Sequence, residues 1–185
     1  MDRRIKMVQE RVVYSSPENP WVTLFFDEVE FPDGGRGRYN RIVERAGVDG
    51  VAVLPVRCGS VGLARQYRYP VGCELWEIPR GFGEANDPRC DAVRELEEEI
   101  GARIHPDALT PLGYVYPNSG LLQSKVILFA ADCSEVALNE SATDGEVSQF
   151  RWVCSEDAFE MAVSGEITDA ISLAALLRSR GLGLI

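Results

Sequence analysis

The chain has 185 residues, of which 45% are hydrophobic and 26% are charged, so it is long enough for one domain with a sizeable core and a modest extension. Its formal net charge of −10 disfavours binding to nucleic acids. No apolar run approaches the roughly 20 residues that span a bilayer, and the first residues lack the apolar segment of a signal peptide. We therefore expect a cytoplasmic protein that binds neither nucleic acid nor membrane.

The cysteine and histidine content excludes several kinds of site. The five cysteines are scattered, odd in number and without a CxxC pair, which suits reduced thiols and argues against a disulfide framework or a zinc site. They are Cys58, Cys73, Cys90, Cys133 and Cys154. With His105 as the single histidine, neither a histidine-built metal site nor a Ser-His-Asp triad is expected.

The first part of the chain reads as a small antiparallel sheet. Apolar and aromatic residues predict strands over 5–14, 21–31 and 38–44, and clusters of Pro, Gly, Asn and Asp predict the turns between them. We expect residues 1–44 to form an N-terminal extension and residues 45–185 to form the main domain.

The rest of the chain alternates strands with a few helices. Strands are predicted over 48–56, 61–68, 74–78, 112–116, 125–131 and 150–153. One helix is predicted over 88–100, a second from its cap Ser155 to about Val163, and a third from its cap Thr168 to about Arg180. This order indicates an α+β or mixed α/β sandwich.

The helix over 88–100 has well-defined ends. Asp87 suits the N-cap, Pro88 suits the first helical position, and Gly101 suits the position just after the last turn. The predicted buried stripe consists of Val93, Leu96 and Ile100.

The same helix carries four acidic residues within five positions. Glu95 and Glu99 are separated by one helical turn, with Glu98 beside them, so their carboxylates project together from another face. The simplest alternative is a solvated acidic helix. However, a strand at 74–78 and a glycine-containing loop at 79–83 lead into this helix, and Mg²⁺ is typically held by a few carboxylates together with substrate phosphates. We therefore interpret the segment as a site for a metal-bound phosphate.

These residues resemble the Nudix hydrolase signature, G-x5-E-x7-R-E-U-x-E-E-x-G-U, where U is a bulky aliphatic residue. The matching positions are Arg94, Glu95, Leu96, Glu98, Glu99 and Gly101. The departures are Asn86 at the position of the first acid, Gly81 one residue closer to the helix, and the small Ala102 at the end. Glu84 is a candidate substitute for the missing acid.

The resemblance implies the α/β/α Nudix sandwich and a Mg²⁺ or Mn²⁺ site. It assigns the metal to Glu95 and Glu99, with help from Glu98, and adds the backbone carbonyl of Arg80. Arg94 is expected to pair with a helix carboxylate and orient it.

A second set of residues resembles the ADP-ribose pyrophosphatase branch of that family. It consists of residues 62–70 and 74–79, Pro117 at 15 residues after Ala102, and residues 164–176. This implies substrate contacts by Arg68 and Arg65, whose planar guanidinium groups suit phosphate, and by Glu77, which could accept from ribose or adenine. In the alternative, the arginines only cap a strand edge. Trp76 is expected in the core.

The implied reaction cleaves ADP-ribose to AMP and ribose 5-phosphate. A general base is expected on a mobile loop before the last strand, where Glu146 aligns best, with Glu140 and Asp144 as alternatives. The chain reads Leu121–Lys125 where this branch often has an acidic residue, which weakens the assignment to ADP-ribose itself.

Three alternatives stay open. They are a GDP-mannose or other nucleotide-sugar pyrophosphatase, a hydrolase of nucleoside triphosphates, and a non-catalytic domain that binds a nucleotide and regulates a partner. The resemblance also implies a homodimer in which the N-terminal strands cover the partner, consistent with the many apolar residues of a sheet that would be unstable alone.

Overall fold

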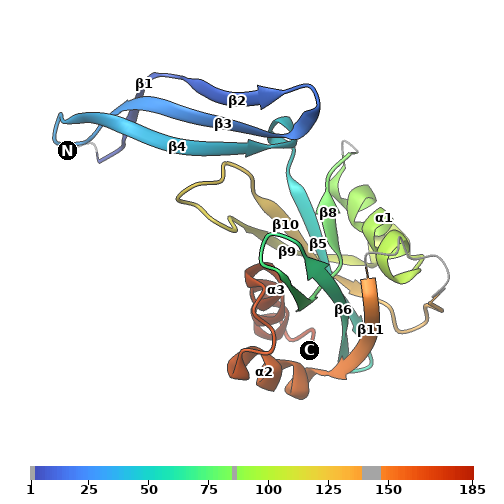
Figure 1. Cartoon of the computed structure of the whole chain (residues 1–185). Coiled ribbons are helices and arrows are strands. Elements are labelled where there is room, and N and C mark those ends of the chain that lie inside the picture. The colour runs from blue at the N-terminus through green and yellow to red at the C-terminus, as the bar shows by residue number, and fades with distance from the viewer. Residues whose placement is uncertain (1–2, 85–86, 139–146) are drawn as a thin grey trace. The chain divides into compact units, whose positions relative to one another are not determined.

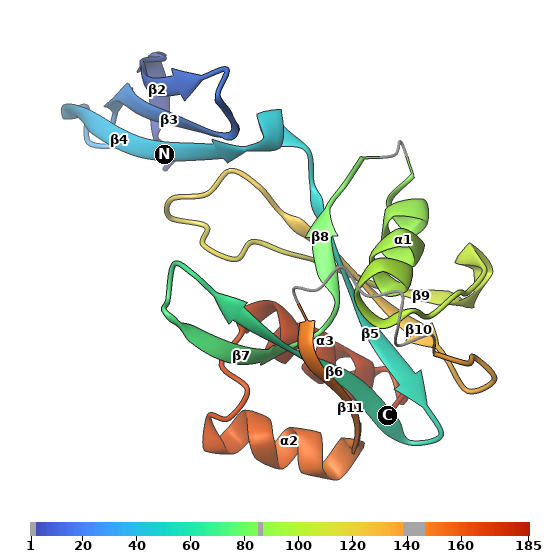
Figure 2. The same ribbon diagram turned by 45° about the vertical axis from the view of Figure 1, so that its right-hand side comes forward.

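The structure of the chain, a computed structural model, describes residues 3–84, 87–138 and 147–185 (Figure 1 and Figure 2). The chain divides into two compact units. The first comprises Met1–Val48 together with Tyr116–Lys125, and the second comprises Asp49–Val115 together with Val126–Ile185. Each unit is therefore built from two separated stretches of sequence.

The first unit contains a four-stranded sheet organised around β3 (Asn19–Glu30). β4 (Arg36–Glu44) pairs with one edge of β3, and β1 (Lys6–Gln9) and β2 (Val12–Ser16) share the other edge. A short 3-10 helix, η1 (Arg45–Gly47), follows β4. The prediction of one strand over 5–14 was wrong. Between β1 and β2 the Arg11 N–H turns to the Asp27 carboxylate, 3.1 Å away, instead of continuing a strand.

A buried carboxylate, Asp27, holds part of this unit together. Asp27 is 5% exposed and accepts from Arg41 Nε at 2.8 Å. Arg41 also donates to Glu10 Oε2 at 2.8 Å and to Gln123 Oε1 at 2.7 Å. We call Asp27, Arg41, Glu10 and Gln123 the Asp27 cluster. Backbone hydrogen bonds from Ile42 to the same segment add to the Gln123 contact, which explains why residues 116–125 belong to this unit.

The second unit contains a seven-stranded sheet with the order β11-β6-β5-β10-β9. β5 (Gly50–Arg57) and β6 (Ser60–Arg68) pair only near their shared turn, and then β7 (Cys73–Glu77) continues on β6 while β8 (Arg80–Phe82) continues on β5. The remaining strands are β9 (Leu109–Val115), β10 (Val126–Asp132) and β11 (Val147–Cys154). β10 runs parallel to β5, and the other pairs are antiparallel.

Helices cover both faces of this sheet (Figure 1). Because side chains alternate along β5, Ala52 and Leu54 join the core under α2 (Ser155–Ser164) and α3 (Ala170–Gly181), whereas Val53 joins the core under α1 (Pro88–Ile100). Another 3-10 helix, η2 (Pro106–Ala108), precedes β9. The predicted mixed α/β class and its three-layer arrangement are confirmed.

The predicted bounds of α1 are confirmed. The Asp87 carboxylate accepts from the Arg89 N–H, Pro88 is the first helical residue, and Gly101 has the left-handed backbone expected after the last turn. Leu96 and Ile100 are buried, whereas Val93 is only partly buried.

Three local predictions were wrong. Ser155, expected as the cap of α2, is its first helical residue, and its hydroxyl donates to the carbonyl oxygen of Gly59 instead of capping the helix. Residues 80–82, expected in a loop, form β8 because they pair with β5. The cap of α3 is Asp169 instead of Thr168, since the Asp169 carboxylate accepts from the Ser172 N–H at 2.8 Å while Thr168 is exposed.

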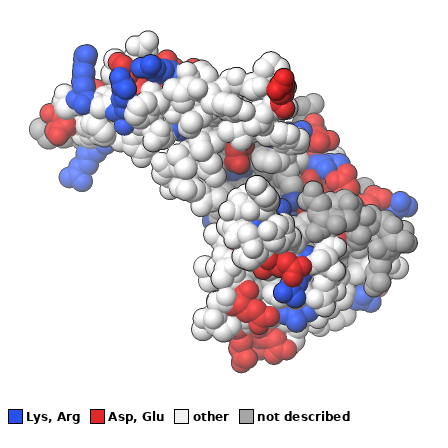
Figure 3. All heavy atoms as spheres, viewed as in Figure 1, with Lys and Arg blue, Asp and Glu red and all other residues white. Residues whose placement is uncertain are grey.

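The net charge is unevenly distributed. On the face shown in Figure 3, acidic side chains gather over α2, whose first turn contains Glu156 and Asp157, and several basic side chains lie on the first unit. None of the helices in the described residues has the length and apolar character needed to cross a membrane.

Candidate active site

Two buried carboxylates lie between α1 and β8. Glu95 and Glu99 are only 6% and 3% exposed, although each carries a carboxylate. Glu99 Oε1 accepts from the backbone N–H of Arg80 at 3.0 Å, which fixes this carboxylate against β8. Burial of ionised carboxylates requires partners or a cation, so this pair is the natural centre of a site.

Gly81 makes room for the second carboxylate. A Cβ atom on Gly81 would collide with the carboxylate of Glu95, so no larger residue fits at this position without displacing it. The two carboxylates therefore lie against neighbouring residues of β8: Glu99 contacts Arg80, and Glu95 contacts Gly81. The signature places its first glycine one residue earlier, at position 80, and the contact with Glu95 explains why this chain has a glycine at position 81.

Arg94 holds Glu95 and the loop before α1. Its Nη2 lies 2.7 Å from Glu95 Oε1 and donates to the carbonyl oxygen of Phe82 at 2.8 Å. Its Nη1 donates to Glu98 Oε2 at 2.7 Å. Burial lowers the pKa of Arg94, but the neighbouring charges of Glu95 and Glu98 raise it more, so the net pKa is above the usual value. This geometry suits the orienting role predicted for Arg94.

Asp91 is a residue of this site that the sequence motif did not single out. It is buried in the first turn of α1, and its Oδ1 accepts from the Glu84 N–H at 2.9 Å. Asp91 therefore fastens the loop that leads from β8 into the helix. An acidic residue in the first turn of a helix does not by itself indicate a functional site, because it also stabilises the helix by interacting with the helix dipole.

The side chains present suit a divalent cation that is completed by substrate. Among the residues that the structure describes, no group of three or more His, Cys, Asp or Glu side chains is arranged to hold a metal ion. Glu98 pairs with Arg94 and its side chain is 47% exposed, so the help predicted from it is not in place here. The buried Glu95 and Glu99 remain, and two carboxylates plus phosphate oxygens match the usual Mg²⁺ environment.

A group of alternating charges lies next to this pair. Glu77 has no exposed surface and accepts from Arg68 Nη2 at 2.6 Å and from Arg80 Nε at 2.9 Å. Arg80 Nη1 lies 3.4 Å from Asp169 Oδ1. We call Glu77, Arg68, Arg80 and Asp169 the Glu77 cluster. It joins β6, β7, β8 and the start of α3 with two positive and two negative groups.

The two arginines of this cluster differ in how many of their side-chain nitrogens bind carboxylates of the cluster. All three terminal nitrogens of Arg80 face Glu77 or Asp169. Arg68 uses Nε and Nη2 on Glu77, and its side chain is partly exposed. Burial lowers the pKa of Arg68, but the hydrogen bonds and charge of Glu77 raise it more. Arg68 is thus a fixed cation with one edge available to an anion.

The position of Glu77 does not fit the substrate contact predicted for it. Both of its oxygens are bonded to arginines, and no part of it is exposed to a ribose or a base. The sequence could not reveal this, because burial of a glutamate depends on arginines from other strands. Its place in the structure is that of an anchor for Arg68 and Arg80.

The other predicted residues lie elsewhere or outside the described parts. Arg65 pairs with Glu74 at 3.1 Å and lies over the ring of Trp76, which is buried in the core as expected. Pro117 belongs to the first unit, whereas Glu95 and Glu99 belong to the second. Asn86 and the three candidate bases lie outside the described residues, these bases being Glu140, Asp144 and Glu146.

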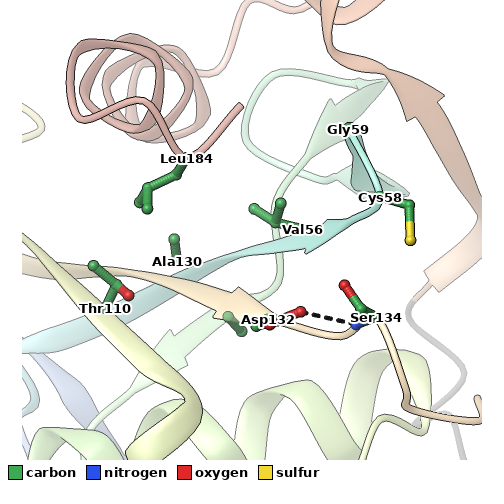
Figure 4. Close-up of a pocket in the computed structure, with 9 residues that line it drawn as sticks. Val56, Cys58, Gly59, Thr110, Ala130, Asp132, Ser134 and Leu184 are labelled. Atoms are coloured by element: carbon green, nitrogen blue, oxygen red, sulfur yellow. Dashed lines mark hydrogen bonds between the residues drawn. The ribbon is translucent and has the colours of Figure 1, made fainter.

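A separate pocket of about 330 Å³ lies at the other end of β5 (Figure 4). It is lined by Val56, Cys58, Gly59, Thr110, Ala130, Ala131, Asp132, Ser134 and Leu184. Asp132 accepts from the Ser134 N–H at 3.0 Å within this lining. None of the site residues predicted from the sequence lines this pocket, since β8 and α1 adjoin the beginning of β5.

Two known proteins are similar to most of this chain. A CMP-5'-(N-acetyl-N-hydroxy-3-aminopropyl)phosphonate hydrolase of Streptomyces rubellomurinus is 29% identical over 177 residues, which cover 94% of this chain and 81% of that protein. An ADP-ribose pyrophosphatase of Mycobacterium tuberculosis is 27% identical over 154 residues, which cover 82% of this chain and 72% of that protein.

A solved structure shares the whole fold. The crystal structure of an ADP compounds hydrolase matches with a TM-score of 0.77 at 20% identity, and the match covers 98% of this chain and 97% of that chain.

The NUDIX domain family matches residues 46–174, a span that includes β8, α1 and the sheet that they adjoin. The chain therefore belongs to the Nudix hydrolase family, as its resemblance to the Nudix signature predicted, and it is similar to the ADP-ribose pyrophosphatase-like branch of that family.

Proposed function

We propose that this protein hydrolyses the diphosphate of a nucleoside diphosphate linked to another group, with ADP-ribose as the first substrate to test and AMP and ribose 5-phosphate as its products. The observation that carries this proposal is the buried pair Glu95 and Glu99 next to the fixed cation Arg68. Similarity to the mycobacterial ADP-ribose pyrophosphatase supports the choice of substrate.

The roles of the residues follow from their chemistry. Bound Mg²⁺ or Mn²⁺ would neutralise the diphosphate and lower the pKa of a water molecule. Glu95 and Glu99 would hold it together with the carbonyl oxygen of Arg80, while Arg94 keeps Glu95 in place. Arg68 would bind a phosphate oxygen through the edge that Glu77 leaves open. The oxygen of water joins one phosphorus, and the bridging P–O bond breaks.

The proton released by the attacking water needs an acceptor. We assign this role to Glu146, since its position before β11 matches the loop acid of the similar branch. Glu146→Gln is expected to lower kcat with little change in KM, because the binding residues stay intact. A larger loss in Glu140→Gln or Asp144→Asn would move the base to that residue.

A second candidate substrate is favoured by the alignment that covers most of the chain. The Streptomyces relative acts on a CMP-linked phosphonate. Such a compound also joins a nucleotide to a second phosphorus group. A metal ion held by Glu95 and Glu99, together with Arg68, would therefore bind it equally well. GDP-mannose and other nucleotide sugars present the same diphosphate. The candidates therefore differ in the base and in the leaving group, not in the reaction class.

One assay separates these possibilities. Purified protein is incubated with ADP-ribose, GDP-mannose, CDP-linked compounds and nucleoside triphosphates in the presence of Mg²⁺, and the nucleoside monophosphate is measured by chromatography. We expect release that stops when the metal is chelated. Binding of a nucleotide without release of products from any substrate would instead identify a non-catalytic regulatory domain.

A pair of variants tests the metal assignment. Glu99→Gln should lower kcat by on the order of 10²-fold, because it removes a charged metal ligand from a nearly unchanged helix. Glu97→Gln is the matched control, since Glu97 lies on the same helix but pairs with Arg103 at the surface. Half of the normal activity in Glu99→Gln at saturating Mg²⁺ would contradict the assignment.

We further propose that the protein is a homodimer that associates through the first unit. Large apolar side chains are exposed on its strands and at its N-terminal end, which a monomer would leave in water. They are Ile5, Met7, Val8, Val12, Val13, Tyr14, Trp21 and Tyr39. Light scattering at micromolar concentration should give twice the mass of one chain, and a mass near 20.5 kDa would contradict the dimer.

A further inference from the structure

The beginning of α3 is hydrogen-bonded to the segment between β7 and β8, which precedes the candidate metal ligands in the sequence. Asp169 Oδ2 accepts from the Ser172 N–H at 2.8 Å and from the Ser172 hydroxyl at 2.7 Å. The same hydroxyl oxygen accepts from the backbone N–H of Ile78 at 3.0 Å. Ser172 is fully buried, so these bonds connect the helix cap directly to the chain between β7 and β8.

The other oxygen of Asp169 faces Arg80. Oδ1 lies 3.4 Å from Arg80 Nη1, and the Asp169 side chain is 9% exposed. Arg80 gives its remaining side-chain nitrogens to Glu77 and its backbone N–H to Glu99. Arg80 is thus held on its side chain by two carboxylates while its backbone holds one of the proposed metal ligands.

We propose that Asp169 is a positioning residue for the metal site and that it acts through Arg80. This inference rests on the proposed function, because it takes Glu95 and Glu99 as the ligands. Asp169 and Glu77 fix the Arg80 guanidinium from two sides, and the rigid Arg80 backbone then sets the position of Glu99. The motif around Asp169 resembled the ADP-ribose branch, but the sequence assigned no role to this residue.

The charge of Asp169 can be separated from its role as a helix cap. Asn is as good an N-cap as Asp, so Asp169→Asn keeps the acceptor for Ser172 and the start of α3. It removes the negative charge that faces Arg80. Loss of an outer partner of a metal ligand typically weakens metal binding about 10–100-fold. We therefore expect a folded protein with impaired metal binding.

The test measures metal binding directly, without substrate. Mn²⁺ is titrated into the full-length protein by calorimetry, and Tm is recorded for each variant. Asp169→Asn should raise the Kd for Mn²⁺ about 10-fold with a Tm close to that of the unaltered chain. Asp157→Asn is the matched control, because it removes an exposed acid from the first turn of α2 and should change neither quantity.

A double-mutant cycle tests the route through Arg80. Arg80→Gln should raise the Kd by a similar factor, and adding Asp169→Asn to it should have little further effect, since coupled residues are not additive. Independent, multiplying effects would overturn the route, and a Kd within twofold of normal in Asp169→Asn would overturn the inference. If Asp169→Asn does not fold, an unchanged Kd in Arg80→Gln overturns it instead. No Mn²⁺ binding by the unaltered chain would contradict the proposed function itself.

Discussion

The Asp27 cluster of the first unit and the Glu77 cluster of the second unit both combine carboxylates with arginines. The Asp27 cluster has one arginine, and the Glu77 cluster has two. Each is centred on a buried carboxylate that binds arginine. Arg41 in the first unit has a second acid, Glu10, and an amide, Gln123, as further partners. Arg68 and Arg80 in the second unit share the carboxylate of Glu77, and Arg80 also faces Asp169.

This difference indicates what each cluster does. Asp27 and Arg41 join β3 and β4 to residues 116–125 and to the two residues between β1 and β2. Arg41 also stacks on the ring of Phe25 at 3.9 Å, so the cluster stabilises a sheet. Glu77 instead holds two arginines in fixed positions beside buried carboxylates. Glu77 is a buried acid that binds two partly buried arginines, so its charge is costly to lose, and such an arrangement is typical of a functional site.

The largest effect is expected from Glu77→Gln. The change keeps the size of the side chain but leaves Arg68 and Arg80 with Asp169 as the remaining nearby acid of the cluster. Breaking a buried ion pair on one side typically costs about 3–5 kcal/mol of the free energy of unfolding. Urea unfolding would measure this loss, and hydrolysis of the preferred substrate should fall as well, because Arg68 loses its anchor.

Glu74→Gln provides the control for that change. Glu74 also pairs with an arginine of β6, but both side chains are partly exposed, and such pairs contribute little to stability. Its unfolding midpoint should stay close to that of the unaltered chain. Equal losses in both variants would mean that burial of Glu77 does not matter, which would contradict the comparison.

The next effect is expected from Gly81→Ala. The added methyl group would displace the Glu95 carboxylate, which is the end of a flexible side chain, so metal geometry should suffer more than stability. We expect kcat to fall by on the order of 10-fold or more, since small misplacements of reacting groups are costly. Gly181→Ala is the control, because a Cβ there meets open space at the end of α3. Normal activity in Gly81→Ala would contradict the proposed use of Glu95.

Local signals in the sequence predicted some parts of this structure well. The ends of α1 depend on Asp87, Pro88 and Gly101, which act on their own helix, so the sequence alone located them. The Nudix signature likewise identified the buried pair Glu95 and Glu99, because helical spacing places them on one face. In these cases the necessary information lies within one or two turns of the residue concerned.

Other parts depend on distant segments and could not be predicted. Residues 80–82 form a strand only because β5 lies beside them, and the break between β1 and β2 depends on Asp27. The buried role of Glu77 requires Arg68 from β6 and Arg80 from β8. Nothing in the neighbouring sequence of these residues shows which partner the fold will bring to them.

The smallest effect is expected from Asp27→Asn in the first unit. Arg41 keeps Glu10 and Gln123 as partners, so the loss near neutral pH should be about 1.5–3 kcal/mol, the usual contribution of a hydrogen bond to a charged group. Arg41 thus keeps a second acid, Glu10, whereas Arg68 loses the carboxylate that both its Nε and its Nη2 bind. A loss as large as that in Glu77→Gln would contradict the distinction between the two clusters.

At acidic pH, the difference in the free energy of unfolding between the unaltered chain and Asp27→Asn should become smaller. Burial raises the pKa of Asp27, but hydrogen bonds from Arg41 and from the Arg11 N–H lower it more, so the pKa of Asp27 in the folded protein lies below the usual pKa of an aspartate. A carboxylate whose pKa is lower in the folded state stabilises the protein above its unfolded pKa and loses that contribution as the pH falls through the folded pKa. Urea unfolding of the unaltered chain and of Asp27→Asn should therefore differ less at about pH 3 than at about pH 6. An equal difference at both pH values would show that the charge of Asp27 does not stabilise the first unit.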